Sequence, residues 1–510
     1  MPHRPRAGTA VAGLALFAAA AAVGFGVVPA PAADAATPRP AVPHVVKVVA
    51  ISSSAFTVRV GETAHATSFR VYVARTKRGL HVARIRHARH SASQRSRLVT
   101  IRRLRYRATP YYYRVEAVNG KRHRWDTTIH AVRLRPPTPA GLRATAGHAG
   151  TYLTWRAEPA TGWQITRSTR RNFSAGRRTY RIRGANPSFT PYGLVKGRTY
   201  WFRVQAMNGS TKSAPAAAVH ATPRTALQSI RIATYNVLEA NTAGALESGV
   251  ALAAWPARRA GVVASIRKSG AAVVAVQEAA AWIGSPTGFG GTRQIDDLRR
   301  ALGGDWSLAT TETPPTTHGF RRTADYVLYR SRVYQPAAAG GHWSLGDQRW
   351  AAYQLLRNRA TGARVIAVSP HLLAGAGARY DTLRQREATR LLAFGAAYAR
   401  STGAPIVYAG DFNSTVNRNH VFDGPGIVMR AAHVADSADA AQHMTNGQYN
   451  SANLNMRRPP TVGQSIDHIY APPGVAVVSR TVVVKLVHGR FVGAIPSDHN
   501  LVEARLAFPY

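Results

Sequence analysis

Cysteine is absent from this chain of 510 residues. Disulfides therefore cannot stabilise any part of it, and each domain must be held by packing alone. Apolar residues make up 45% of the sequence, which is enough for sizeable cores, and the length predicts two to four domains. Beyond the N-terminus, no segment is long and apolar enough to span a bilayer.

The first 36 residues have the pattern of an export signal. A short basic region is followed by an apolar stretch at 10–28, and residues 33–35 read Ala-Asp-Ala, which suits signal cleavage. The alternative is a membrane anchor, but glycine and proline interrupt the apolar stretch, so cleavage is favoured. Export without cysteine is more typical of bacteria than of animals. We therefore expect a secreted bacterial protein, free or associated with the cell wall.

Acidic residues are also scarce in this sequence. The chain has 23 Asp+Glu against 67 Lys+Arg, a formal net charge of +44. Residues 1–226 hold 38 basic and 5 acidic residues, and residues 227–510 hold 29 and 18. Most of the basic residues are arginine, which binds phosphate in a bidentate fork. This balance predicts salt-sensitive binding to polyanions. A solvated arginine-rich surface is the alternative, but it does not explain the scarcity of acids.

A repeat precedes the C-terminal half. Residues Tyr111–Gly120 match Tyr200–Gly209 at an offset of 89 residues, and both alternate apolar and polar side chains before an Asn-Gly turn. Each copy resembles a fibronectin type III module, which implies a small β-sandwich. We assign the modules to 41–136 and 137–223. The first is divergent, because it is very basic and lacks the usual core tryptophan.

Residues 228–510 alternate between strand-like and helix-like segments. Helices are predicted from Trp255 to Gly270 and over Asp381–Arg400. The polar run from Arg384 to Glu387 is expected on the solvated face of the second helix. Strands are predicted at 230–235, 271–276, 324–329 and 364–369.

Four acids lie close to apolar, strand-like runs. Glu278 follows the run at 271–277, and Asp411 follows the run at 405–410. Asp467 lies within the segment Ser465–Tyr470, and Asp498 follows the run at 491–495. An acid at the end of a strand is held rigidly at a sheet edge, which suits it to bind a metal or to orient a base.

Six short motifs in a fixed order resemble those of the endonuclease/exonuclease/phosphatase superfamily. They are Ala233–Leu238, Val276–Glu278, Ser369–Leu372, Gly410–Asn413, Ile466–Tyr470 and Ser497–His499. Each alone is weak, but six in order over 228–510 are specific. The resemblance implies an α/β four-layer sandwich, in which two packed β-sheets are flanked by helices. It also implies hydrolysis of phosphoesters with Mg²⁺, with Mn²⁺ or Ca²⁺ as alternatives.

The resemblance also assigns roles to residues. Metal ligands would be Asn236, Glu278 and Asp498, with Asn236 bound through its amide oxygen or lying just behind the ligands. His499 would be the general base, oriented by Asp467. Asp411 and His371 would assist catalysis, and Asn413 would bind a phosphate oxygen. Two departures stand out: Leu238 occupies a position where some members have an acid, with Glu239 beside it expected to face away, and Pro370 precedes the first histidine.

Membership of this superfamily does not fix the substrate. The favoured interpretation is an extracellular nuclease, because the arginine-rich modules could hold a nucleic acid while the C-terminal domain cuts it. A phospholipid or sphingomyelin phosphodiesterase is the second interpretation. The third is a catalytically inactive binding protein on the cell surface. The modules could also bind an anionic cell-wall polymer, and the sequence does not indicate an oligomeric state.

Overall fold

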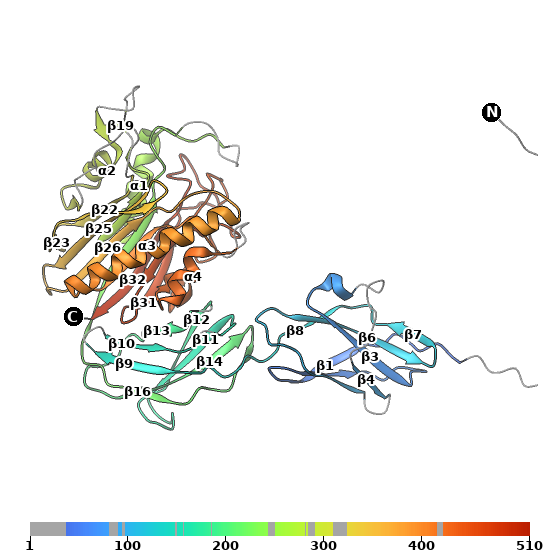
Figure 1. The fold of residues 1–510 in the computed structure, drawn as a ribbon. Helices are drawn as coiled ribbons and strands as arrows, with labels where there is room; N and C mark the ends of the chain where they lie inside the picture. The colour runs from blue at the N-terminus through green and yellow to red at the C-terminus, as the bar shows by residue number, and fades with distance from the viewer. Residues whose placement is uncertain are drawn as a thin grey trace, which may run out of the picture.

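The computed structural model shows two small β-rich modules followed by a larger C-terminal domain (Figure 1). The residues that it describes are 37–509, apart from 81–89, 94–96, 148–149, 157, 185, 243–249, 281, 284–290, 310–323 and 416–421. The predicted export signal lies outside these residues. Among the helices of the described residues, none is long and apolar enough to cross a membrane.

Each module consists of two antiparallel sheets around its own core. In the first, the sheet β1-β2-β5 faces the sheet β4-β3-β6-β7, in which β8 also pairs with β6. Its strands are β1 Val45–Ile51, β2 Phe56–Val60, β3 Ser68–Ala74, β4 His90–Ser93, β5 Leu98–Ile101, β6 Tyr111–Asn119, β7 Arg122–Trp125 and β8 His130–Val132. This arrangement fits a fibronectin-like module.

The second module repeats the arrangement. The sheet β13-β10-β9 packs on β12-β11-β14-β15, where β16 pairs with β14. Its strands are β9 Arg143–Gly147, β10 Gly150–Thr154, β11 Gly162–Ser168, β12 Arg178–Arg183, β13 Ser188–Phe189, β14 Tyr200–Asn208, β15 Thr211–Lys212 and β16 Val219–Ala221. The repeated sequence segments form β6 and β14, which hold equivalent positions in the two modules.

Hydrogen bonds fix each part to the next. Asn208 at the end of β14 is fully buried, and its side-chain amide donates to the carbonyls of Leu134 and Arg107 in the first module. The second module contacts the C-terminal domain through Ser188, whose hydroxyl donates to the His433 carbonyl at 2.9 Å. The modules are therefore attached to the C-terminal domain in a defined orientation.

The C-terminal domain has two seven-stranded sheets packed face to face. One sheet has the order β21-β22-β18-β17-β32-β31-β29, and the other β23-β25-β26-β27-β30-β28 with β24 paired to β25. The strands are β17 Leu227–Asn236, β18 Val273–Gln277, β21 Trp306–Leu308, β22 Tyr326–Arg330, β23 Tyr334–Pro336, β24 Gly341–Gly346, β25 Arg349–Asn358, β26 Arg364–Pro370, β27 Ile406–Asp411, β28 Ala435–Asp436, β29 His443–Thr445, β30 Asp467–Ala471, β31 Ala476–Val483 and β32 Leu501–Pro509. A separate pair joins β19 Trp282–Ile283 to β20 Thr292–Arg293.

Helices cover the outer faces of both sheets. On the first sheet lie α1 Trp255–Ser269 and α2 Gln294–Leu302. On the second lie α3 Ala378–Thr402 and α4 Gly424–Ala431, while α5 Ser437–Ala440 is a single short turn. The apolar core between the sheets is built mainly by valine, alanine and isoleucine. The predicted four-layer α/β sandwich is confirmed.

Helix α1 begins and ends where the sequence predicts, with proline in its first turn and Gly270 in the left-handed region at φ 64°. The interpretation of α3 as solvated at 384–387 is wrong for two of the four residues. The side chains of Arg384 and Glu387 are fully buried, together with Asp381 one turn earlier. The helix therefore buries a polar face in its first half.

Candidate active site

Five strands of the C-terminal domain bring polar side chains to one edge of the two sheets. Asn236 and Asp411 end β17 and β27, and Asp467 begins the antiparallel β30 directly opposite Asp411. Glu278 follows β18, and His371 follows β26. Glu278, His371 and Asp411 line a polar cleft of about 790 Å³. The residues that line the cleft are Glu239, Asn241, Thr242, Glu278, Ala280, Ala324, Arg349, His371, Ala374, Asp411, Asn413 and His499.

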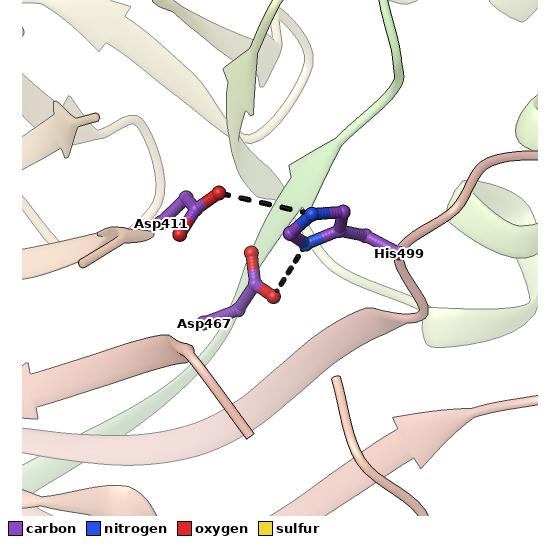
Figure 2. A group of neighbouring side chains, drawn as sticks. All are labelled: Asp411, Asp467 and His499. Carbon is purple, nitrogen blue, oxygen red and sulfur yellow. Dashed lines mark hydrogen bonds and ion pairs between the residues drawn. The ribbon is translucent and has the colours of Figure 1, made fainter. Parts of the chain in front are cut away.

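Two aspartates and one histidine form a buried cluster, in which the His499 ring lies between Asp411 and Asp467 (Figure 2). Asp411 and His499 line the cleft. The Nδ1 atom of His499 is 2.7 Å from Oδ2 of Asp467, and its Nε2 atom is 3.8 Å from Oδ2 of Asp411. All three side chains are at least nine-tenths buried. Asp467 thus fixes the ring of His499 so that Nε2 faces Asp411 and the cleft.

The carboxylates around His499 favour its protonated form. Burial alone lowers the pKa of His499, but the negative charges of Asp467, Asp498 and Asp411 outweigh it and hold the pKa well above its ordinary value. A cation bound at the same carboxylates would oppose this effect, because its charge would offset theirs.

His371 has the opposite preference. Its Nε2 lies 3.6 Å from Oδ2 of Asp411, and burial lowers its pKa to about 4. The imidazole is therefore neutral near pH 7 and carries one N–H that it can donate. Its Nδ1 lies 3.9 Å from Oδ1 of Asp325, an acid that no sequence motif indicated and whose pKa burial raises well above its ordinary range.

Asn236 connects two of the acids. Its side-chain nitrogen donates to Glu278 at 2.8 Å and to Asp411 at 3.2 Å, while its oxygen accepts from the backbone N–H of Leu238. Asn236 therefore holds two carboxylates together behind the cleft, which is one of the two places predicted for it. Binding of a metal by its amide oxygen stays a prediction.

The turn after Asn236 also corrects the expectation for Glu239. Leu238 is in the left-handed region at φ 57°, so the chain does not continue as a strand, and Glu239 lines the cleft. Strand alternation had placed it on the other side. The buried Arg258 of α1 donates to the carbonyls of Val237, Leu238 and Glu239, which keeps this turn in place.

Helix α3 positions the segment that follows His371. The guanidinium of Arg384 donates to the carbonyls of Leu373 and Gly375 at 2.8 and 2.9 Å and pairs with Asp381 at 2.6 Å. The carboxyl of Glu387 accepts from the Leu373 N–H at 2.9 Å. The buried polar face of α3 therefore fixes the loop that leads away from His371.

Two further predicted residues occupy different positions. The side-chain nitrogen of Asn413 donates to the Leu372 carbonyl at 3.0 Å, and the residue lines the cleft at φ 49°. Asp498 does not line the cleft; its carboxylate accepts from the Ser497 hydroxyl at 3.2 Å. Burial raises its pKa, and the charge of Glu278 adds to that rise.

The donor set fits a hard divalent cation. Burial raises the pKa of Glu278 as well as that of Asp498, so the negative charges at this edge are costly without a counter-charge. Asp411 and Asp467 bring two more carboxylates to the same edge, with oxygens within 4.8 Å of each other, and Oδ1 of the buried Asp467 has no hydrogen-bond donor among the described residues. Oxygen-rich ligands of this kind suit Mg²⁺, Mn²⁺ or Ca²⁺.

Arg349, at the start of β25, was missed by the sequence analysis. It lines the cleft, and its charge lowers the pKa of His371. Nothing in its sequence neighbourhood marks it, because it is one of 67 basic residues and belongs to no motif.

The family model described as "Endonuclease/Exonuclease/phosphatase family" matches residues 233–499, slightly more than half of the chain. The protein belongs to this family, whose members hydrolyse phosphoester bonds. No curated protein matches it in a sequence search.

Solved structures of the family resemble the C-terminal domain. A family protein from Bacteroides thetaiotaomicron is 16% identical, with a TM-score of 0.42, and the match covers 56% of this chain and 99% of that one. The mannosyl-6-phosphatase Bt3783 of the same organism is also 16% identical, with a TM-score of 0.41 and coverage of 54% and 99%. The human nocturnin catalytic domain, with a bound sulfate anion, is 16% identical, with a TM-score of 0.39 and coverage of 56% and 96%.

Proposed function

We propose that this protein is a secreted phosphodiesterase that hydrolyses nucleic acid with the help of a divalent cation. The observation that carries the proposal is the placement of His499 between two aspartates at a polar cleft. Asp467 holds the proton on Nδ1, so in the neutral ring, which a cation bound at the carboxylates would favour, Nε2 accepts a proton on the cleft side.

The proposed reaction is attack of water on phosphorus. As the new bond between phosphorus and the water oxygen forms, Nε2 of His499 takes a proton from the water, and the bond to the leaving ester oxygen breaks. Neutral His371 donates its N–H to a phosphate oxygen, and Arg349 offers a guanidinium to the same charge. Mg²⁺ held by Glu278 and Asp498 would neutralise the phosphate and the leaving oxygen.

Nucleic acid is favoured as substrate because of charge. The net charge of +44 concentrates polyanions near the protein. Arg349, His371 and Asn413 present cationic or hydrogen-bonding groups inside the cleft.

A phospholipid is the second candidate, and one feature favours it. A second, mostly apolar cavity of about 490 Å³ lies between α1 and the segment at 483–500 and shares His499 with the cleft. Val487 and Val492, which line it, are 51% and 71% exposed. An acyl chain could occupy such a cavity.

A substrate panel decides between these candidates. Plasmid DNA, RNA, sphingomyelin micelles and inositol phosphates are each incubated with the full-length protein in Mg²⁺ or in chelator, and kcat/KM is compared. Faster, metal-dependent cleavage of DNA or RNA supports the nuclease. Cleavage of sphingomyelin alone would support the lipid enzyme, and no cleavage of any substrate would favour the inactive binding protein.

A further inference from the structure

The second module docks against one end of the C-terminal domain (Figure 1). Its Asn186 and Thr190 contact Val434 and Gly474, close to the ends of β28 and β30 that point away from Asp467. Strand β17 runs from this end to Asn236 at the cleft, and its ten residues span about 30 Å. A ligand on this module is therefore separate from a phosphoester in the cleft.

One sheet face of this module carries cations and no acid. The module, residues 137–223, has 13 Lys+Arg and a single acid, Glu158. On β12 the side chains of Tyr180 and Ile182 point into the core, so Arg181 and Arg183 point outward. Both arginines are exposed, and no ion pair or hydrogen bond with another described residue holds either one.

The outward face continues from these arginines across the sheet. Gln164 on β11 lies opposite Arg181 on one side and Gln205 of β14 on the other. The amide of Gln164 donates to Gln205 and accepts from Lys212 at 2.8 Å, so a row of polar groups crosses four strands. This face is hydrophilic and positively charged.

A groove of about 340 Å³ borders this face where it meets the C-terminal domain. Arg181 and Arg183 line it on one side, and Gln442, which follows α5, lines it on the other. The side-chain nitrogen of Gln442 is buried and has no acceptor among the described residues. The lining residues that the structure describes include no carboxylate. Donors without acceptors in a positively charged groove suit an anionic group.

One acidic residue, Asp439, lies close to the groove. It lies against the backbone of Gly184, next to Arg183. Burial, with help from the charge of Asp436, raises the pKa of Asp439 to about 7, so it carries only part of a negative charge at neutral pH. The net charge of the groove therefore remains positive.

The face offers no open aromatic ring to a nucleic-acid base. Among the outward-facing residues of β11, β12, β14 and β15, the one aromatic side chain is that of Trp201. The ring of Trp201 lies 4.7 Å from that of His220 and 5.7 Å from the guanidinium of Arg171. Single-stranded nucleic acids bind largely by base stacking on exposed aromatics. A charged polymer without bases fits this face better than a single-stranded nucleic acid does.

We propose that the groove and the adjoining face of the second module bind a linear polyol-phosphate polymer, which anchors the protein while the cleft at the opposite end remains accessible. Arg181 and Arg183 lie about 7 Å apart on one strand and contact successive phosphates. Gln442 donates to the phosphate that sits in the groove. This inference does not depend on what the cleft hydrolyses.

The test compares two double variants of equal net charge in the full-length protein. Binding to poly(glycerol phosphate) is measured across a salt series in chelator, so that the cleft cannot cut the polymer. Arg181→Gln with Arg183→Gln should weaken binding about tenfold and reduce the slope of log K against log salt by about 1.4, since each lost contact contributes about 0.7. Arg143→Gln with Arg177→Gln, both exposed elsewhere on the module, should change affinity less than twofold.

A third variant and two further measurements complete the test. Gln442→Glu should also weaken binding, because it replaces the buried donor by a carboxylate. The two arginine double variants should keep the melting temperature of the parent, since their side chains are exposed. Equal losses in the two double variants would overturn the proposal in favour of a non-specific charge effect. Tighter binding of a single-stranded DNA than of an abasic strand with the same number of phosphates would overturn it in favour of a nucleic-acid site.

Discussion

Asp467→Asn is expected to lower kcat of phosphodiester cleavage about 10- to 100-fold. The variant keeps the shape of the side chain but removes the charge that lies 2.7 Å from Nδ1 of His499. A hydrogen bond to a charged group contributes about 1.5–3 kcal/mol, and each 1.36 kcal/mol is a factor of ten in rate. An asparagine can also donate to Nδ1, which would place the ring proton on Nε2 and block its action as a base.

The pH dependence gives this prediction a second readout. Asp467 is the partner that contributes most to raising the pKa of His499 against the effect of burial. Its removal should lower that pKa, so the rising limb of the kcat–pH profile should move to lower pH. A merely structural role for Asp467 would lower activity without this shift.

The chain supplies a matched control. Asp436 and His468 form a second buried pair at 2.6 Å, and His468 lies next to Asp467 in sequence but is not among the residues that line the cleft. Asp436→Asn should reduce stability and leave the kcat of the folded fraction unchanged. The reasoning is refuted if Asp467→Asn retains the parental kcat, or if Asp436→Asn lowers it equally.

Three further outcomes are expected. Arg384→Ala should lower the free energy of unfolding by about 3–5 kcal/mol, because it removes the positive charge that lies 2.6 Å from the buried carboxylate of Asp381; urea unfolding measures this, and a loss below 1 kcal/mol would contradict it. The pKa of His468 is raised to about 9, because the charge of Asp436 outweighs the lowering by burial. The stabilisation from this pair is therefore complete below about pH 6.5 and is lost as the pH rises through 9. Between pH 6 and pH 10 the melting temperature should fall more for the parent than for His468→Gln. Glu239→Gln should raise the concentration of Mg²⁺ needed for half-maximal activity several-fold, because it removes a negative charge from the cleft; an unchanged metal titration would show that Glu239 takes no part.

The sequence was sufficient for the sandwich and for most of the strand ends at the cleft. Motifs placed Glu278, Asp411 and Asp467 beside apolar, strand-like runs, and the ends of the strands lie close to these acids in the structure. The position of Glu239 was predicted wrongly because Leu238 has a positive φ, which ends the strand-like alternation of side chains after Asn236. A leucine does not indicate a positive φ in the sequence.

Buried polar residues were the second source of error. Arg384 and Glu387 are spaced as a helical face, but the pattern assumes that the buried face is apolar. Their partners are backbone groups in the loop after His371, which come close only in the folded chain. The docking of the second module, through Ser188 and His433, left no sequence signal for the same reason.

The central claim is tested most directly by the cleavage of plasmid DNA and of a small phosphodiester by the full-length protein. Both substrates are incubated with Mg²⁺ or chelator, and His499→Ala serves as the blank. We expect turnover of both substrates with Mg²⁺, none in chelator, and a loss of at least about 100-fold in kcat for the variant with little change in KM. Turnover that persists in chelator, or that is unchanged in His499→Ala, would contradict the account.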